Sequence, residues 1–246
     1  MKRAILLVPA TALMVHGQNL IQDPSFENPA LTPTSALDSV QFFNGGTTIS
    51  GAWNVNGSVD RNVLTVHQNF DIYADSVSHG FGPAQSGSQY LDLSGAYFTG
   101  TAPTVSQDFA TVPGQQYSLS FFLGASDGFN ANQNPIHPPL NSVGVHVDPD
   151  VGPNLVNDLL TPPAPLSTAN GTQIQWGKHT YLFTASSSST RLTFQDLSGF
   201  DDNTSFVDSV SVQTVPEALP MNWALGALVG VTLAGSTCFK RQTSAA

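Results

Sequence analysis

The stretch Ser205–Val212 alternates along its length with a period of two residues. Side chains on a β-strand point alternately to opposite faces of the sheet. The alternation therefore predicts a strand with Phe206, Asp208, Val210 and Val212 on one face, which we expect to look into a core. Asp208 is the exception, because a carboxylate turned toward a core is costly unless charges or hydrogen-bond donors compensate it.

Similar short patterns recur through the middle of the chain. The strongest is Gln116–Leu123, where Tyr117, Leu119, Phe121 and Leu123 share one face and are predicted to form the centre of the core. Only 10% of the residues are charged, whereas the chain holds 21 glycines and 17 prolines, which favours short strands joined by turns. The sequence therefore predicts an all-β fold without repeats.

These strands are expected to form one β-sandwich over residues 18–214. A segment rich in Pro, Asn and Gly, residues 127–171, interrupts the pattern and contains one good strand, Val143–Val147. The rest of that segment is predicted to be a long insertion at the surface of the domain.

The distribution of charge limits the partners. The chain has 7 basic and 17 acidic residues, and four of the basic ones (Lys2, Arg3, Lys240 and Arg241) lie at its two ends. The central part therefore holds three cations (7 − 4) against all 17 acidic residues. Such a surface repels nucleic acid and anionic lipid, and it suits calcium, a neutral polysaccharide or simple solubility. Cys238 lies in the tail, so the domain has no internal disulfide.

The first residues have the form of a secretory signal. Met1-Lys2-Arg3 is followed by an apolar run over residues 4–15, which predicts a signal peptide over residues 1–17 and a mature chain starting at Gln18. An uncleaved anchor and a buried first strand are the alternatives.

The last 32 residues, 215–246, are predicted to attach the protein to a membrane. Met221–Phe239 carries no formal charge and is long enough to span a bilayer as a helix. The basic residues after it predict a cytoplasmic C-terminus with the domain outside. The motif Val215-Pro216-Glu217, the apolar segment and the basic end together resemble a PEP-CTERM sorting signal, although Ala218 stands where a second proline is usual. The resemblance implies cleavage by an exosortase-type enzyme; the alternative is a plain membrane anchor.

Several pieces of the middle, taken in order, resemble the choice-of-anchor C family of exported bacterial proteins. That family is similar to a plant cell-wall family of unknown molecular function. The pieces are Asn19–Ile21 with Ser25–Glu27, Ile49–Trp53 with Gly57–Asp60, Gln89–Gly95, Val105–Phe109 with Pro113–Phe121, and Phe206–Val212. The chain departs from the family at Ala52, at Ser209 and in the 127–171 insertion. The resemblance implies a galactose-binding-like jelly roll, the fold of many carbohydrate-binding modules, but it implies no particular ligand.

The resemblance also suggests a structural calcium ion. Related jelly rolls often bind Ca²⁺ between the opening Phe-Glu segment and the closing strand, which points here to Glu27 and Asp208, with backbone carbonyls completing the shell. The alternative is that Asp208 bonds backbone amides or a hydroxyl near a strand end.

Carbohydrate contacts are predicted on loops, where aromatic faces and polar side chains can grip a sugar. Trp53 and Trp176 lie at strands, where a tryptophan is more often part of the core. The better candidates are five loop aromatics: Phe81, Tyr97, Phe98, Phe129 and Phe200.

Catalytic motifs are missing from the sequence. It holds no Gly-x-Ser-x-Gly elbow between a strand and a helix, no zinc-ligand spacing among its histidines, and only two glutamates, Glu27 and Glu217. We therefore predict a non-catalytic module, exported and either surface-anchored or associated with an extracellular matrix, that binds extracellular or cell-envelope polysaccharide. The alternative is a structural or adhesive surface protein without a glycan ligand. Its expected partners are an exosortase-type enzyme and the membrane, but not nucleic acid.

Overall fold

The computed structural model describes eleven parts of the chain, and all the regular structure in them is β-strand. The described residues are 17–30, 40–43, 45–56, 64–68, 83–93, 103–125, 128–129, 135–136, 141–168, 171–198 and 205–216.

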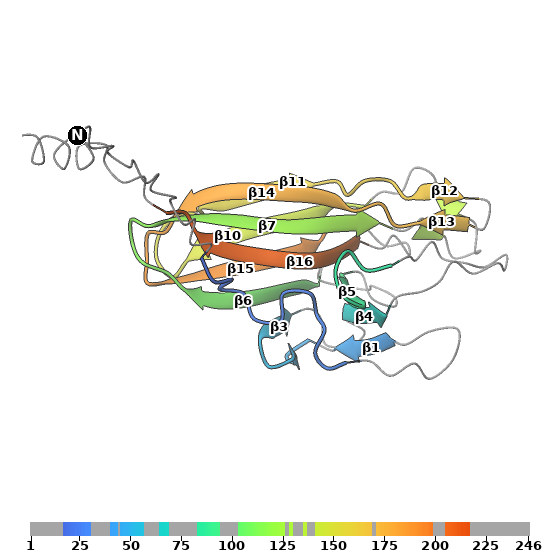
Figure 1. Ribbon diagram of the computed structural model, residues 1–246, viewed down its shortest axis with the longest axis horizontal. Coiled ribbons are helices and arrows are strands. Elements are labelled where there is room, and N and C mark those ends of the chain that lie inside the picture. Colours follow the sequence, from blue (N-terminus) through green and yellow to red (C-terminus); the bar gives the residue numbers. More distant parts are fainter. Residues whose placement is uncertain are drawn as a thin grey trace, which may run out of the picture. The chain divides into compact units, whose positions relative to one another are not determined.

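Two antiparallel six-stranded sheets build the domain (Figure 1). Sheet A has the order β1 (Val40–Phe43), β4 (Leu64–Gln68), β5 (Gln89–Asp92), β16 (Ser205–Thr214), β7 (Gln116–Ala125) and β14 (Gly177–Thr184). Sheet B has the order β11 (Val156–Leu160), β10 (Val143–Pro149), β15 (Ser189–Asp196), β6 (Thr104–Ala110), β3 (Trp53–Asn56) and β2 (Thr48–Ile49). Two small ladders pair β8 (Gly128–Phe129) with β9 (Pro135–Ile136), and β12 (Leu166–Thr168) with β13 (Gly171–Gln173).

The path of the chain is that of a jelly roll. Along the sequence the eight strands β3, β5, β6, β7, β10, β14, β15 and β16 lie alternately in sheet B and sheet A. The predicted all-β jelly-roll sandwich is therefore confirmed. Within the segment predicted to be an insertion, β10 lies inside sheet B between β11 and β15, so that part of the segment belongs to the sandwich.

The core fills the space between the sheets. The predicted face of β7 is confirmed, because Tyr117, Leu119, Phe121 and Leu123 are all buried in it. Phe121 of sheet A meets Phe194 of sheet B edge to face, with 5.0 Å between ring centroids. Such aromatic contacts add to the burial of apolar area that stabilises the sandwich.

Trp53 belongs to this core rather than to a surface. Its side chain is fully buried, and its ring lies 5.3 Å from that of Phe26 and 6.3 Å from that of Phe194. Its Nε1–H donates to the carbonyl of Asp23 at 3.0 Å, which satisfies the polar atom that burial would otherwise leave without a partner.

The closing strand differs from its prediction. Phe206, Asp208, Val210 and Val212 were expected on one face, but a β-bulge between Asp208 and Ser211 shifts the register against β7. Ser209, at the bulge, has a positive φ of 55°. A bulge adds one residue to a strand and exchanges the faces beyond it. Val210 and Val212 consequently point into the core.

Residues before the bulge have the opposite orientation to the one predicted. Phe206 packs with Tyr90 and Ile174 in a second apolar cluster, which Ala84 and Trp176 cover. Its register partner across the strands is Gly124 of β7, where a Cβ would lie 2.5 Å from Ile174 Cγ2. Glycine at 124 therefore lets this cluster approach the outer face of sheet A.

The opening segment runs antiparallel beside the second half of β16. Leu20 N–H donates to Val212 O at 2.9 Å, and Val210 N–H donates to Pro24 O at 2.8 Å. The side chain of Asn19 joins the same pairing, because its Nδ2 donates to Val210 O and its Oδ1 accepts from Val212 N–H. The two ends of the domain are thus hydrogen-bonded to each other.

Candidate functional site

Glu27 and Asp208, the predicted calcium ligands, both bind the loop Gln85–Gln89. Glu27 Oε1 accepts the backbone N–H groups of Ser88 at 2.7 Å and Gln89 at 2.8 Å, and its Oε2 accepts the Ser88 hydroxyl at 2.9 Å. Asp208 Oδ2 accepts the N–H groups of Gln85 at 2.8 Å and Ser86 at 3.0 Å. The structure therefore brings the two carboxylates to one loop, and Asp208 accepts from backbone amides and from the Ser209 hydroxyl, which lies 3.4 Å from its Oδ1.

Burial dominates the electrostatics of Asp208. The side chain has no exposed surface, and this desolvation raises the pKa of the carboxyl to about 6, against the lowering effect of its hydrogen bonds to Ser86, Ser209 and Gln85. Among the described residues, no three His, Cys, Asp or Glu side chains come together in a way that could hold a metal ion. Calcium binding by Glu27 and Asp208 stays a prediction.

Gly87 makes the loop possible. Its φ of +73° is the left-handed conformation that glycine adopts most readily, and a Cβ there would lie 2.2 Å from Glu27 Oε1. The sequence Gln-Ser-Gly-Ser-Gln contains small polar residues around a glycine, which is the signal that could have indicated a loop wrapping a carboxylate.

A second candidate site is the outer surface of sheet B, called here the polar face. Residues paired across antiparallel strands put their side chains on the same side of a sheet. One such row crosses all six strands and consists of Thr48, Asn54, Ser106, Thr193, His146 and Asn157. With neighbouring strands about 4.8 Å apart, the row is about 24 Å long. Ser106 is buried, and the other five residues offer hydroxyl, amide and imidazole groups to a ligand.

A cavity of about 340 Å³ lies on the polar face. It is lined by Gly46, Thr47, Thr48, Asn54, Val55, Asn56, Ser106 and Arg191. The β2–β3 hairpin builds one wall. Its three-residue connection, 50–52, has positive φ at Ser50 and Gly51, and Ala52 N–H donates to Ile49 O at 3.0 Å. This tight turn sets the register that places Thr48 beside Asn54.

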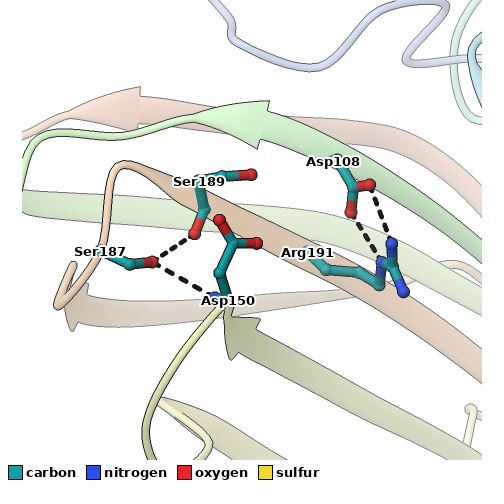
Figure 2. Close-up of polar contacts among 5 residues, drawn as sticks. All are labelled: Asp108, Asp150, Ser187, Ser189 and Arg191. Atoms are coloured by element: carbon teal, nitrogen blue, oxygen red, sulfur yellow. Dashed lines mark hydrogen bonds and ion pairs between the residues drawn. The ribbon is translucent and has the colours of Figure 1, made fainter.

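Arg191, on the wall of the cavity, is held in place by a carboxylate. Its Nε donates to Asp108 Oδ1 at 2.6 Å and its Nη2 donates to Asp108 Oδ2 at 2.9 Å, so the two planar groups meet fork to fork (Figure 2). The hydrogen bond from Arg191 lowers the pKa of Asp108, outweighing the opposing effect of partial burial. Asp108 is therefore ionised at neutral pH.

The polar face was missed from the sequence. Its residues are the polar half of the same alternation that identified the strands, but a polar half-strand is also what any solvated surface shows. Four of the loop aromatics predicted to contact sugar, Phe81, Tyr97, Phe98 and Phe200, lie outside the described residues, and Phe129 lies in β8. Those contacts stay predictions.

Residues 19–213 match a known family, described as "Protein of unknown function (DUF642)". This chain is a DUF642 protein. The match begins at Asn19 and ends at Gln213, so it spans the sandwich from the paired opening segment to the closing strand. This is the plant cell-wall family expected from the ordered pieces of the sequence. No curated protein matches this DUF642 chain.

Three of the solved structures similar to the DUF642 chain are matched over nearly the whole of their own length. TmCBM61 in complex with β-1,4-galactotriose is 12% identical and has a TM-score of 0.43, covering 80% of this chain and 99% of its own. The CBM22-1 xylan-binding domain from Paenibacillus barcinonensis Xyn10C is 12% identical, with a TM-score of 0.35 and coverages of 74% and 97%. The K1 cleaved adhesin domain of Lys-gingipain from Porphyromonas gingivalis W83 is 15% identical, with a TM-score of 0.36 and coverages of 78% and 96%.

The predicted attachment segments fall largely beyond the described ranges. Residues 1–16 and the apolar segment 221–239 lie outside them, as does Glu217 of the sorting motif. Val215 still belongs to the sandwich, because its N–H donates to Gln116 O at 2.9 Å, and Pro216 after it is exposed. Within the described part of the chain, no helix is long and apolar enough to cross a membrane.

Proposed function

We propose that this protein is a non-catalytic module that binds polysaccharide on the polar face of sheet B. The observation that carries the proposal is the row of uncharged hydrogen-bonding side chains from Thr48 to Asn157, with the cavity at one end. A glycan is a chain of hydroxyl groups that donate and accept hydrogen bonds, and this row offers both kinds of partner along its length. The length of the row suits several linked sugars rather than one.

The charge state of the carboxylate beside the cavity supports binding without chemistry. Glycoside hydrolysis needs a protonated acid beside the scissile bond, which requires a raised pKa. On the polar face the pKa of Asp108 is lowered by Arg191, so its carboxylate has no proton to give at neutral pH. Among the described carboxyls, the two whose pKa is raised to about 6, Asp196 and Asp208, are buried elsewhere in the sandwich.

The location that fits this function is outside the cell. The resemblance to the choice-of-anchor C family, the signal-like residues 1–17 and the PEP-CTERM-like tail 215–246 support export followed by attachment to the surface or matrix. The membrane would hold the chain through residues 221–239 until an exosortase-type enzyme cuts near Pro216-Glu217. Structural calcium at Glu27 and Asp208 is part of the same proposal.

A binding experiment with one matched pair of variants tests the function. The purified protein is titrated with soluble neutral polysaccharides by calorimetry, and Asn54→Ala is compared with Asn154→Ala. Asn54 is exposed on the polar face and lines the cavity, whereas Asn154 is exposed on the turn between β10 and β11. Losing one or two hydrogen bonds to the glycan should weaken binding about tenfold in Asn54→Ala.

The control should bind like the wild type. Equal affinity of Asn54→Ala and wild type would place the ligand on another surface. Absence of binding to every glycan, with and without calcium, would favour the alternative of a structural or adhesive matrix protein.

A further inference from the structure

We propose that the polar face selects uncharged glycan chains and rejects uronate-containing ones, because Asp108, Asp148 and Asp150 outnumber Arg191 on that face. This inference rests on the proposed function and names the class of glycan that the face accepts.

The register of three strands places these charges together. Arg191 of β15 is paired with Asp148 of β10 on one side and with Asp108 of β6 on the other. Asp150 follows β10, where its backbone N–H donates to the Ser187 hydroxyl at 3.3 Å (Figure 2). The same N–H donates to the Ser189 carbonyl at 3.4 Å. The four residues thus form one group on the polar face, and Arg191 of this group lines the cavity.

The net charge of this group is negative. The pKa of Arg191 is raised first by its hydrogen bond to Asp108 and further by the charges of Asp108, Asp148 and Asp150, which means that all three carboxylates act on the same guanidinium. One positive charge against three negative charges leaves a net charge of 1 − 3 = −2. A carboxylate arriving on a ligand is therefore repelled.

Arg191 is also poorly placed to compensate for that repulsion. An arginine usually recognises a carboxylate with two parallel N–H groups, and here Nε and Nη2 already donate to Asp108. A uronate would find this side-on pair of donors occupied and would have to share the guanidinium with Asp108, using the remaining Nη1 and Nη2 hydrogens. The guanidinium is therefore engaged mainly by Asp108, and a ligand meets mostly uncharged groups on this face.

The remaining groups favour hydroxyl ligands. Thr47, Thr48, Asn54, Asn56 and Ser106 line the cavity with hydroxyl and amide groups. These groups can bond the hydroxyls of a neutral sugar, but they carry no positive charge that would offset the repulsion of a carboxylate.

The test compares polymers that differ only in charge. Soluble β-1,4-galactan and mixed-linkage β-glucan are titrated into the purified protein, each in native form and after oxidation of its primary hydroxyls to carboxylates. We expect the oxidised form of the polymer that binds to bind about tenfold more weakly at low salt, because several uncompensated charges meet within a short distance. High salt should reduce the difference in affinity between the native and the oxidised polymer, because it screens the charges.

Two variants locate the effect. Asp148→Asn and Asp150→Asn each remove one negative charge from the group. Each should reduce the difference in affinity between the native and the oxidised polymer. Asp158→Asn is the matched control, because Asp158 is an exposed carboxylate that accepts the Tyr181 hydroxyl at 2.7 Å, away from Arg191. Asp158→Asn should leave the difference in affinity between the two forms of the polymer unchanged. Thermal unfolding checks that all three variants are folded.

The outcomes separate the two proposals. Oxidised polymer that binds as tightly as native polymer overturns the selectivity and leaves the proposed function standing. An effect of Asp158→Asn equal to that of Asp148→Asn and Asp150→Asn also overturns it, because the selection would then come from total charge. Failure of every neutral polymer to bind overturns the proposed function, and the selectivity with it.

Discussion

Replacing Gly87 by alanine should destabilise the domain much more than the same change at Gly114. Both glycines have positive φ, +73° and +85°, so each substitution carries a backbone cost of about 1 kcal/mol. At Gly114 a Cβ would meet nothing within 4 Å, whereas at Gly87 it would lie 2.2 Å from Glu27 Oε1. Only Gly87→Ala has to move a carboxylate.

The cost of moving that carboxylate can be estimated from its hydrogen bonds. Glu27 Oε1 accepts from Ser88 and Gln89, and Gln89 is buried, so water cannot easily replace the bond to its N–H. One lost hydrogen bond to a charged group costs about 2 kcal/mol. Gly87→Ala should therefore lower the free energy of unfolding by about 3 kcal/mol, and Gly114→Ala by about 1 kcal/mol.

Urea unfolding at neutral pH, followed by tryptophan fluorescence, measures both values. A double-mutant cycle with Glu27→Ala isolates the contact, because Gly87→Ala should then cost only its backbone part. Equal losses for Gly87→Ala and Gly114→Ala would refute the reasoning. So would a cost of Gly87→Ala that is unchanged in the Glu27→Ala background.

Three further results are expected. Asp196 and Asp208 have pKa values raised to about 6, above those of the unfolded chain, so their contribution to stability is complete below about pH 4 and is lost as the pH rises through 6. Each group should contribute up to about 3 kcal/mol to the free energy of unfolding, and the protein should therefore unfold at a higher temperature at pH 4.5 than at pH 7.5. A lower unfolding temperature at pH 4.5 would contradict this. Calcium at a hundred times its Kd should stabilise the wild type by about 2.7 kcal/mol and have no effect on Asp208→Ala, whereas no shift in the wild type would end the calcium hypothesis. Trp53→Phe should lower the free energy of unfolding by about 2 kcal/mol and leave glycan affinity unchanged, because Trp53 is buried and its Nε1–H donates to the Asp23 carbonyl. Weaker glycan binding at unchanged stability would contradict the placement of Trp53 in the core.

The strands could be predicted from the sequence because their alternation is strong. The pattern of Gln116–Leu123 gave the core-facing side of β7 without ambiguity, since four large apolar residues recur at every second position. Trp53 followed the usual tendency of a strand tryptophan to be buried.

The closing strand shows where the same reasoning fails. Phe206, Asp208, Val210 and Val212 keep a perfect period of two in the sequence, yet the bulge at Ser209 exchanges their faces. A serine in the left-handed conformation leaves no distinctive mark in a sequence, and only pairing with β7 reveals it.

The candidate sites could be predicted only in part, because they depend on contacts between segments that are distant in the sequence. Glu27 and Asp208 could be linked to one place through the resemblance to jelly rolls that bind calcium. Their partner, the loop of residues 85–89, depends on a backbone path that no side-chain pattern encodes. The polar face depends on which strands become neighbours in sheet B, and those strands are far apart in the sequence.

The pairing of the opening segment with β16 has a mechanical consequence. Gly17 lies beside Thr214, so both ends of the domain leave from the same end of two antiparallel segments. A tension applied between the two ends would peel the opening segment away one hydrogen bond at a time. A tension between the C-terminal tail and a load held on sheet B would instead pull β16 lengthwise against β7, where the whole ladder is strained in shear at once. The domain should therefore resist a tethered load far better than a pull between its two ends.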